Sequence, residues 1–425
     1  MTPSTSSANA ATTTGGIRHD AKVIGLIGSA HFVSHYYILL LPPILVMVKD
    51  YFGVDYTTLG VAITVFNVVS ACLQAPAGFA VDRFGPRALL TGGLLLGAAA
   101  ILLAALVPNY WVFVAAFGLL GLANTVYHPA DYAILSHSIA GKRIGRAFSI
   151  HTFCGYIGSA AAPAGVGISA LLFGWRGAFI AAAILGVAVA FTLLMWGKIL
   201  SRPARNAVEP RLAEEAKQEA KPTQAGWSLL FSAPILRNLF FFVLLALSNG
   251  GVQTYAVVVL GALHGTSTGT ANVALTFFLL MSAMGVLLGG IIADRTRHHE
   301  RVAATCFVVT GSVVALICWV DLSAALLVLA MATGGLLNGV IQPSRDMIVR
   351  SVTPPGSFGK VFGFVSTGFN IGGVVTPLLY GAMIDAGHAD WVFIAVIVAI
   401  VLSLATVITR KRPEQPFHAA PQAAE

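Results

Sequence analysis

Twelve long apolar runs limit the folds that this sequence can adopt. They lie at approximately 23–48, 57–81, 88–107, 110–139, 145–172, 176–197, 237–262, 270–293, 301–320, 322–350, 358–384 and 391–410. A helix of about 20 residues crosses the roughly 30 Å hydrocarbon layer of a bilayer, where lipid offers no partner to an unpaired backbone N–H or C=O group. The runs therefore predict an all-α membrane protein with twelve transmembrane helices.

Composition argues against a soluble protein. Hydrophobic residues make up 57% of the chain and charged residues only 10%, whereas an average soluble domain carries about 25% charged residues. The basic residues behind the net charge of +8 are scattered through short loops and form no stripe that would follow a nucleic acid. The four cysteines have no CxxC spacing. We therefore expect no nucleic-acid partner, no metal site and no cofactor.

The distribution of basic residues predicts the orientation. If the N-terminus is cytoplasmic, every one of the 25 Lys and Arg residues except Lys49, Arg176 and Arg345 falls on the cytoplasmic side. Basic loops remain preferentially in the cytoplasm, so we expect an inner (plasma) membrane protein with both termini inside. The chain then divides into a disordered N-terminal tail (1–22), a first six-helix bundle (23–197), a cytoplasmic linker (198–236), a second bundle (237–410) and a C-terminal tail (411–425).

An internal repeat relates the two bundles. Seven residues of the first half recur with the same identity 214 positions later: Gly121, Asn124, Pro129, Gly145, Phe148, Gly158 and Pro163. Each half contains an even number of crossings, so both halves face the same way. Such parallel repeats are related by an axis along the membrane normal and place a site near the midplane between them. The repeat predicts two pseudo-symmetric six-helix bundles.

A charged motif lies between the second and third predicted helices. It reads Gly78-Phe-Ala-Val-Asp82-Arg83-Phe-Gly85-Pro-Arg87, and a degenerate copy follows 212 positions later at Gly290, Asp294 and Arg295. The motif and its copy resemble the signature loops of the major facilitator superfamily, and this resemblance covers nearly the whole chain. It implies a transporter of two six-helix bundles. It also implies that Gly78, Asp82, Arg83, Gly85, Arg87, Asp294 and Arg295 brace the cytoplasmic gate.

Within that superfamily, the first half is most similar to the fosmidomycin-resistance group of efflux proteins. The matching stretches are His31-Phe-Val, Leu73-Gln-Ala-Pro76, Asp82-Arg83, Tyr127-His128-Pro129 and Gly155-x-x-Gly158. In that group an acid follows His-Pro directly, whereas here Ala130 precedes Asp131, which turns the acid about 100° around a helix. A partial match to the antiporter kink motif at 158–167 also favours efflux.

Two histidines in the first predicted helix mark a candidate site. Ionisable residues within a membrane span are costly and usually face a cavity or a partner. His31 and His35 are four residues apart and share one helix face, and His31 lies about 14 Å past Lys22, near the midplane. They could bind cargo or relay protons, or they could be hydrogen-bonded core residues. Asn249 and Gln253 occupy the equivalent positions in the seventh helix.

The fourth and tenth helices carry an acid and a base at matched positions. One face of the fourth presents Asn124, His128 and Asp131, and the tenth presents Asn338, Gln342 and Arg345. Asp131 lies about 30 Å past Trp111, which predicts a place near the cytoplasmic edge.

Three arrangements of these charges remain open. Asp131 and Arg345 could form an ion pair that closes the inner side. Alternatively, Asp131 could be a protonatable coupling group while Arg345 separately binds an anion. Asp346 is a third possible partner for Arg345. His151 and Tyr156 in the fifth helix and Asn370 in the eleventh are further candidates for cargo or proton contacts.

These features predict a secondary active transporter that works by alternating access. We expect proton-coupled efflux of a drug-like or anionic compound, with proton-coupled uptake of a small organic anion as the alternative. The chain carries no Walker loop for ATP. A membrane redox protein is disfavoured because His31 and His35 share one helix face, and a non-transporting solute sensor is a third class. The expected partners are a small-molecule substrate, protons and the lipid bilayer; we expect a monomer without enzymatic activity.

Overall fold

The computed structural model describes residues 16–139, 141–201, 227–296, 298–354 and 358–408, and its elements are helical. The first half contains α1 (Ile17–Ile38), η1 (Pro42–Ile44), α2 (Leu45–Phe52), α3 (Tyr56–Phe84), α4 (Pro86–Leu106), α5 (Tyr110–Asn124), α6 (Tyr127–Ser138), α7 (Gly141–Trp196) and η2 (Gly197–Ser201). The second half contains α9 (Trp227–Leu230), α10 (Ala233–Gly250), the π-helical turn η3 (Gly251–Tyr255), α11 (Ala256–His264), α12 (Thr268–Arg295), α13 (His299–Trp319), α14 (Ala324–Arg350), α15 (Phe358–Asp385) and α16 (Asp390–Ile408).

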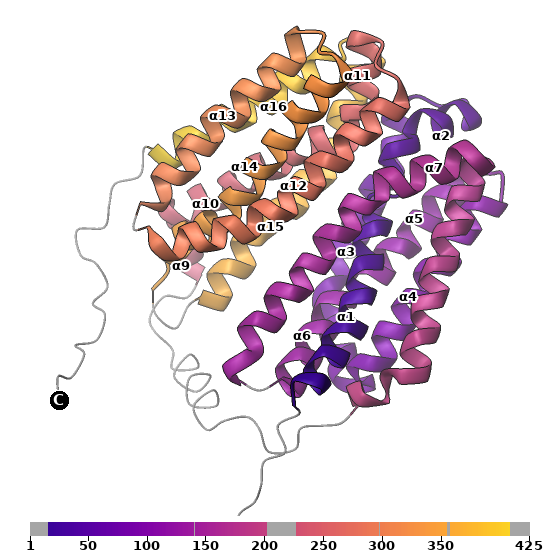
Figure 1. Ribbon diagram of the computed structural model, residues 1–425, viewed down its shortest axis with the longest axis vertical. Coiled ribbons are helices and arrows are strands. Elements are labelled where there is room, and N and C mark those ends of the chain that lie inside the picture. The colour runs from indigo at the N-terminus through magenta and orange to yellow at the C-terminus, as the bar shows by residue number, and fades with distance from the viewer. Residues whose placement is uncertain (1–15, 140, 202–226, 297, 355–357, 409–425) are drawn as a thin grey trace, which may run out of the picture.

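Eleven helical stretches of the described chain are long and apolar enough to cross a membrane. The longest, Arg146–Leu200, has 55 residues and would extend about 80 Å if it were straight. Gly174 breaks α7 with φ 70° and ψ 171°, a backbone conformation that glycine adopts far more readily than other residues. Because α7 supplies two crossings, the twelve-helix fold in two six-helix bundles is confirmed (Figure 1).

Three crossings are interrupted, and prolines explain two of the breaks. Pro42 and Pro43 lack the N–H groups that a continuous helix would need between α1 and α2. In the fourth crossing, the ring of Pro129 is directed at the carbonyl of the residue four positions earlier, Thr125. α5 ends at Asn124, and Thr125 is its C-cap. The seventh crossing changes to the π-helical turn η3 at Gly251. Predicted site residues lie next to the breaks in the fourth and seventh crossings.

The repeat found in the sequence also exists at the level of packing. A Cβ atom on Gly121 would lie 2.5 Å from the carbonyl oxygen of Phe66, and one on Gly335 would lie 2.0 Å from that of Phe278. Phe66 and Phe278 are themselves 212 positions apart. Small residues let membrane helices approach closely, so α3 packs on α5 as α12 packs on α14. The two halves are therefore built alike.

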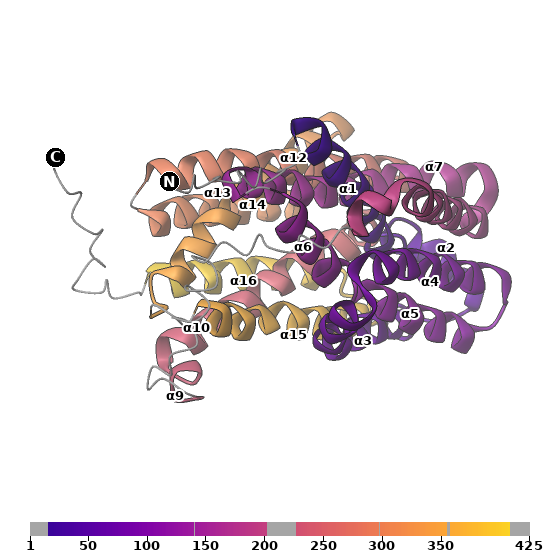
Figure 2. The same cartoon turned by 90° about the horizontal axis from the view of Figure 1, so that it is seen from below.

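The two bundles lie side by side, and α3 contacts α15 while α7 contacts α12 (Figures 1 and 2). Asn67 Nδ2 donates a hydrogen bond to the carbonyl of Gly373 at 2.9 Å, and Thr64 Oγ1 donates to that of Val374 at 3.2 Å. A Cβ on Gly60 would lie 2.7 Å from the Pro377 carbonyl oxygen. These contacts lie in the first half of α3, so the bundles meet at the end away from the α3–α4 turn.

The ends of the bundles differ from two predicted boundaries. α1 begins at Ile17, so residues 17–22 are helical and do not belong to a disordered tail. Asp20 in this first turn forms an ion pair with Arg143 at the start of α7, which explains why the helix extends so far. α9 lies within the predicted linker, and α10 begins at Ala233, four residues earlier than predicted. Residues 1–15, 202–226 and 409–425 lie outside the described chain.

Candidate functional site

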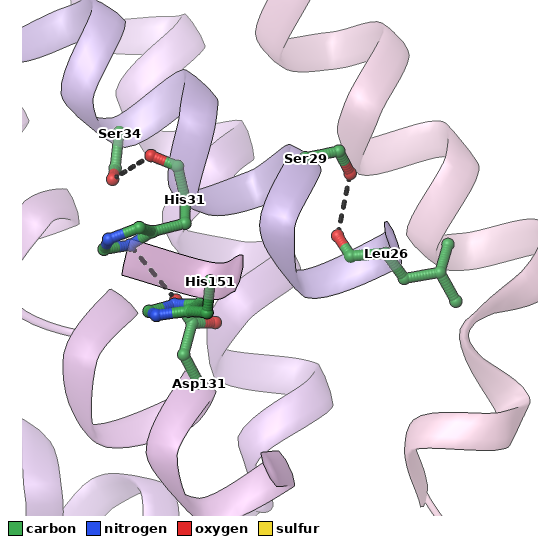
Figure 3. Close-up of polar contacts among 6 residues, drawn as sticks. All are labelled: Leu26, Ser29, His31, Ser34, Asp131 and His151. Atoms are coloured by element: carbon green, nitrogen blue, oxygen red, sulfur yellow. Dashed lines mark hydrogen bonds and ion pairs between the residues drawn. The ribbon is translucent and has the colours of Figure 1, made fainter. Parts of the chain in front are cut away.

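Asp131 on α6 is the centre of a buried polar cluster. Its side chain is 0% exposed. Asp131 Oδ2 lies 2.8 Å from Nε2 of His151 and 3.4 Å from Nδ1 of His31. Figure 3 shows the two imidazoles meeting the carboxylate from α1 and from α7. A buried carboxylate within hydrogen-bond distance of an imidazole can share or transfer a proton with it.

Two further histidines complete this group. The ring of His31 stacks on that of His151 at a centroid distance of 3.9 Å. The ring centroids of His35 and His128 lie 4.6 Å and 5.3 Å from that of His31. His35 Nδ1 lies 3.1 Å from Ser159 Oγ on α7. We call His31, His35, His128, Asp131 and His151 the His–Asp cluster.

Close helix packing brings the cluster together. A Cβ on Gly158 would lie 2.2 Å from the Phe32 carbonyl oxygen, and one on Gly155 would lie 2.7 Å from Nε2 of His31. These two glycines therefore allow α7 to approach α1 closely enough for His31 and His151 to stack. The break that Pro129 introduces between α5 and α6 then directs Asp131 toward them.

Several polar atoms of the cluster are buried without a partner. Among the described residues, Nδ1 of His128, Nδ1 of His151 and Oδ1 of Asp131 make no hydrogen bond. A buried donor or acceptor without a partner costs about 1–3 kcal/mol, so native proteins keep few of them. Their concentration at one point within membrane-spanning helices is typical of a functional site.

The contact between Asp131 and His151 is shorter than the spacing of two neighbouring ligands of one metal ion. One ligand atom each of His31, Asp131 and His151 lies within 4.8 Å of the others. In a tetrahedral site with metal–ligand bonds of about 2.0–2.1 Å, neighbouring ligand atoms are roughly 3.3 Å apart. The 2.8 Å between Asp131 and His151 is instead an ordinary hydrogen-bond length. This contact therefore favours a shared proton, whereas the 3.4 Å between Asp131 and His31 is close to the metal spacing.

Arg345 on α14 forms a second charged group, in the other half of the molecule. Its Nη2 lies 2.8 Å from Oδ1 of Asp346. The guanidinium carbon lies 4.9 Å from the ring centroid of Phe242 and 5.4 Å from that of Phe369. Tyr156 of the first half lies close enough for the charges of Arg345 and Asp346 to act on it. The contacts of Arg345 are therefore with its own half, and its charge acts on the first half at longer range.

The structure chooses among the three arrangements of charge left open by the sequence. Asp131 and Arg345 do not form an ion pair; Asp131 contacts histidines of its own half, and Arg345 pairs with Asp346. The two predicted depths, His31 near the midplane and Asp131 near the cytoplasmic edge, are incompatible, because the two side chains meet. α1 starts before Lys22 and the fourth crossing is broken at Thr125, so counting along straight helices could not give the two depths consistently.

Other predicted site residues lie elsewhere. Asn124 donates a hydrogen bond to Ser70 Oγ at 2.9 Å within the first half. Asn249 and Asn338 line a small cavity of about 30 Å³ inside the second half, room for about one water molecule. The remaining three predicted residues make no side-chain hydrogen bond to the His–Asp cluster or to Arg345 within the described chain: Gln253, Gln342 and Asn370.

The predicted gate motif forms the turn between α3 and α4. Gly85 has φ 88° there, which glycine tolerates best, and Arg87 Nη2 donates to the Leu194 carbonyl near the end of α7 at 3.0 Å. Arg83 lies over the ring of Phe84. A Cβ on Gly78 would meet no atom within 4 Å, so this glycine makes no close helix contact here. Arg295 ends α12, and the side chains of Asp82 and Asp294 lie outside the described part, so the gate role of the motif stays a prediction.

Three residues of the candidate site gave little or no signal in the sequence. Ser159 has the polarity of many helical serines, and its position opposite His35 depends on how α7 packs on α1. Phe242 and Phe369 are apolar in an apolar chain, and only the packing of α10 and α15 brings them to Arg345. Residue type alone could not identify these two, because the chain contains 25 phenylalanines.

Twelve membrane-spanning helices in two repeated bundles, with a buried carboxylate in one half and a largely buried arginine in the other, define a membrane transporter. The family model of the Major Facilitator Superfamily matches residues 27–295 and 239–424. The chain therefore belongs to the Major Facilitator Superfamily.

Individual relatives cover nearly the whole chain. The fosmidomycin resistance protein of Escherichia coli is 22% identical over 400 residues, which cover 91% of this chain and 92% of that protein. The probable sulfoacetate transporter SauU of Cupriavidus necator is 22% identical over 384 residues, 85% of this chain and 87% of that protein. A bacterial homologue of the human lysosomal transporter Spinster, solved inward-facing and occupied, has a TM-score of 0.73 at 13% identity and covers 93% of this chain and 97% of its own. The last comparison shows the fold.

Proposed function

We propose that this secondary transporter is a proton-coupled exporter of a small organic anion or an anionic drug-like compound. One observation carries the proposal: Asp131 is fully buried among membrane-spanning helices and lies 2.8 Å from His151 and 3.4 Å from His31. Carboxylate and histidine chains of this kind mark proton relays in membrane proteins. The proton is held between Asp131 and His151 and leaves when the cluster is opened to water.

The cargo class is inferred from the charge in the second half. Arg345 has a side chain only 12% exposed, and an arginine inside the membrane suits recognition of a carboxylate or phosphonate group. The sulfoacetate transporter among the relatives is named for an anion. The fosmidomycin resistance protein is named for drug resistance, which supports export over import.

The proposed location is the inner membrane of the cell. The proposed orientation places both termini in the cytoplasm, in accordance with the positive-inside rule. The hydrogen bonds between the halves, from Thr64 and Asn67 on α3, then lie near the outer side. With the halves joined there, the structure corresponds to an inward-facing state. Transport requires that these outer contacts break while contacts at the α3–α4 turn form, and a monomer suffices for this cycle.

A second candidate function, proton-coupled uptake, is supported by the separation of the two charged groups. Because Arg345 pairs with Asp346 and not with Asp131, a proton and an anion need not compete for one site. Symport requires both to bind in the same state, whereas exchange requires them to bind in different states. The direction of flux distinguishes the two.

Flux in proteoliposomes tests the proposal. The assay compares benzoate, methylphosphonate and a cationic dye, each with an inward or an outward proton gradient. We expect anions to move against the proton flow, and Asp131→Asn to abolish the effect of the gradient. Asp321→Asn, which removes an exposed carboxylate after α13, is the matched control and should keep it. Movement of anions with the proton flow would instead establish uptake, and anion flux that ignores the gradient in the unmodified protein would reject proton coupling.

A further inference from the structure

The guanidinium of Arg345 is held by two aromatic rings. Phe242 on α10 and Phe369 on α15 lie 4.9 Å and 5.4 Å from its carbon atom, and the two ring centroids are 4.9 Å apart. Cations are attracted to such rings within about 6 Å of the centroid. Contacts from two other helices therefore restrict the plane of the guanidinium before any anion arrives.

Asp346 is a poor partner for this guanidinium. A single oxygen, Oδ1, accepts from both Nε at 2.9 Å and Nη2 at 2.8 Å. Adjacent residues point about 100° apart on a helix, so the carboxylate reaches the guanidinium with one oxygen only. The strong arginine–carboxylate geometry uses two parallel bonds, one to each oxygen. Asp346 is also 49% exposed, and solvent weakens such pairs.

Arg345 retains donors for a better partner. A guanidinium has five N–H groups, and the two bonds to Asp346 occupy one on Nε and one on Nη2. Within the described residues no second acceptor binds the remaining groups. Tyr156 of the first half lies within the field of this ion pair, so an anion at Arg345 would change the field that acts on the first half.

We infer that Asp346 is a built-in counter-ion, and that a carboxylate or phosphonate head of an organic acid replaces it at Arg345 by presenting two of its oxygens. This inference rests on the proposed function in taking Arg345 as the anion site. The cargo head forms two parallel bonds with the guanidinium plane that Phe242 and Phe369 hold. Asp346 turns toward water, and it returns when the cargo leaves. Without cargo, the arginine is never left as an unpaired charge in the membrane.

Binding of benzoate and methylphosphonate to the purified full-length protein tests the exchange. Binding is measured from the concentration dependence of the thermal unfolding midpoint, with uncharged benzyl alcohol as the ligand control. Loss of the competing charge-assisted bonds in Asp346→Asn should tighten anion binding roughly tenfold. Asp321→Asn should leave binding unchanged. Arg345→Lys keeps the charge but lacks the planar fork, so it should weaken binding roughly tenfold.

The outcomes separate this inference from the proposed function. The counter-ion role is overturned if anions bind Asp346→Asn no more tightly than they bind the unmodified protein. Asp346→Ser provides the same test if Asp346→Asn does not fold. Equal binding by Arg345→Lys overturns the two-oxygen geometry. If binding tightens as expected but no anion flux follows a proton gradient, proton coupling fails while the counter-ion role stands. Gradient-driven flux with unchanged binding rejects the counter-ion role alone.

Discussion

Asp385 at the end of α15 caps the start of α3 through Thr57, and thereby joins the two halves of the transporter. Its Oδ2 accepts hydrogen bonds from the Thr57 backbone nitrogen at 2.7 Å and from the Thr57 hydroxyl at 2.6 Å. Its Oδ1 accepts from the backbone nitrogen of Tyr56 at 2.8 Å. A carboxylate at a helix N-terminus satisfies N–H groups that have no partner in the helix and interacts favourably with the helix dipole.

Removal of this contact should favour the opposite conformation. Asp385→Ala deletes three hydrogen bonds between the halves, and we expect the outer side to open several-fold more often. The measurement is the rate at which a membrane-impermeant maleimide labels a cysteine introduced by Thr64→Cys, in a protein without its four native cysteines. Asp390→Ala, five residues further along, is the control. Equal labelling rates in both variants would show that Asp385 does not hold the outer side closed.

Asp131→Asn should separate proton coupling from exchange. The amide keeps the shape of the side chain but cannot take up or release a proton beside His151, 2.8 Å away. We therefore expect loss of gradient-driven net flux with retention of anion exchange across liposomes that contain cargo on both sides. Both are measured with labelled benzoate. A variant that still follows the pH gradient would remove Asp131 from the coupling mechanism.

Reversal of both charges, Asp131→Arg with Arg345→Asp, should not restore transport lost in either single variant. Arg345 pairs with Asp346, and Asp131 lies among histidines of the other half. Asp131→Arg therefore places a cation among histidines, and Arg345→Asp places an anion next to Asp346. Neither change recreates an ion pair. The readout is benzoate flux in the two single variants and the double variant at matched reconstitution levels. Rescue in the double variant would demonstrate direct pairing in another state of the cycle.

Gly158→Ala should destabilise the first bundle. The added Cβ would lie 2.2 Å from the Phe32 carbonyl oxygen, and overpacking of this kind costs about 1–3 kcal/mol. Because α1 and α7 must move apart, the stacking of His31 on His151 is also lost. The test compares the thermal unfolding midpoint with that of Gly25→Ala, where a Cβ meets no atom within 4 Å. Equal midpoints for the two variants would mean that the α1–α7 contact tolerates the methyl group.

Much of the fold follows from short-range information in the chain. Apolar run length predicts each crossing, because a membrane helix satisfies its own backbone whatever its neighbours are. The matched glycines Gly121 and Gly335 indicate the repeat because each alone permits its helix contact. Even the polar candidates His31, Asp131 and Arg345 stand out, since charged residues are rare in such segments.

Which of these candidates meet depends on how the helices pack. Residues 31, 131 and 151 are far apart in the chain, and their contact requires the break at Thr125 and the close approach of α1 to α7 at Gly158. A count of 1.5 Å per residue along a straight helix includes neither effect. For the same reason Asp131 and Arg345, equivalent in the repeat and opposite in charge, suggested a pair in the sequence and form two separate groups in the folded protein.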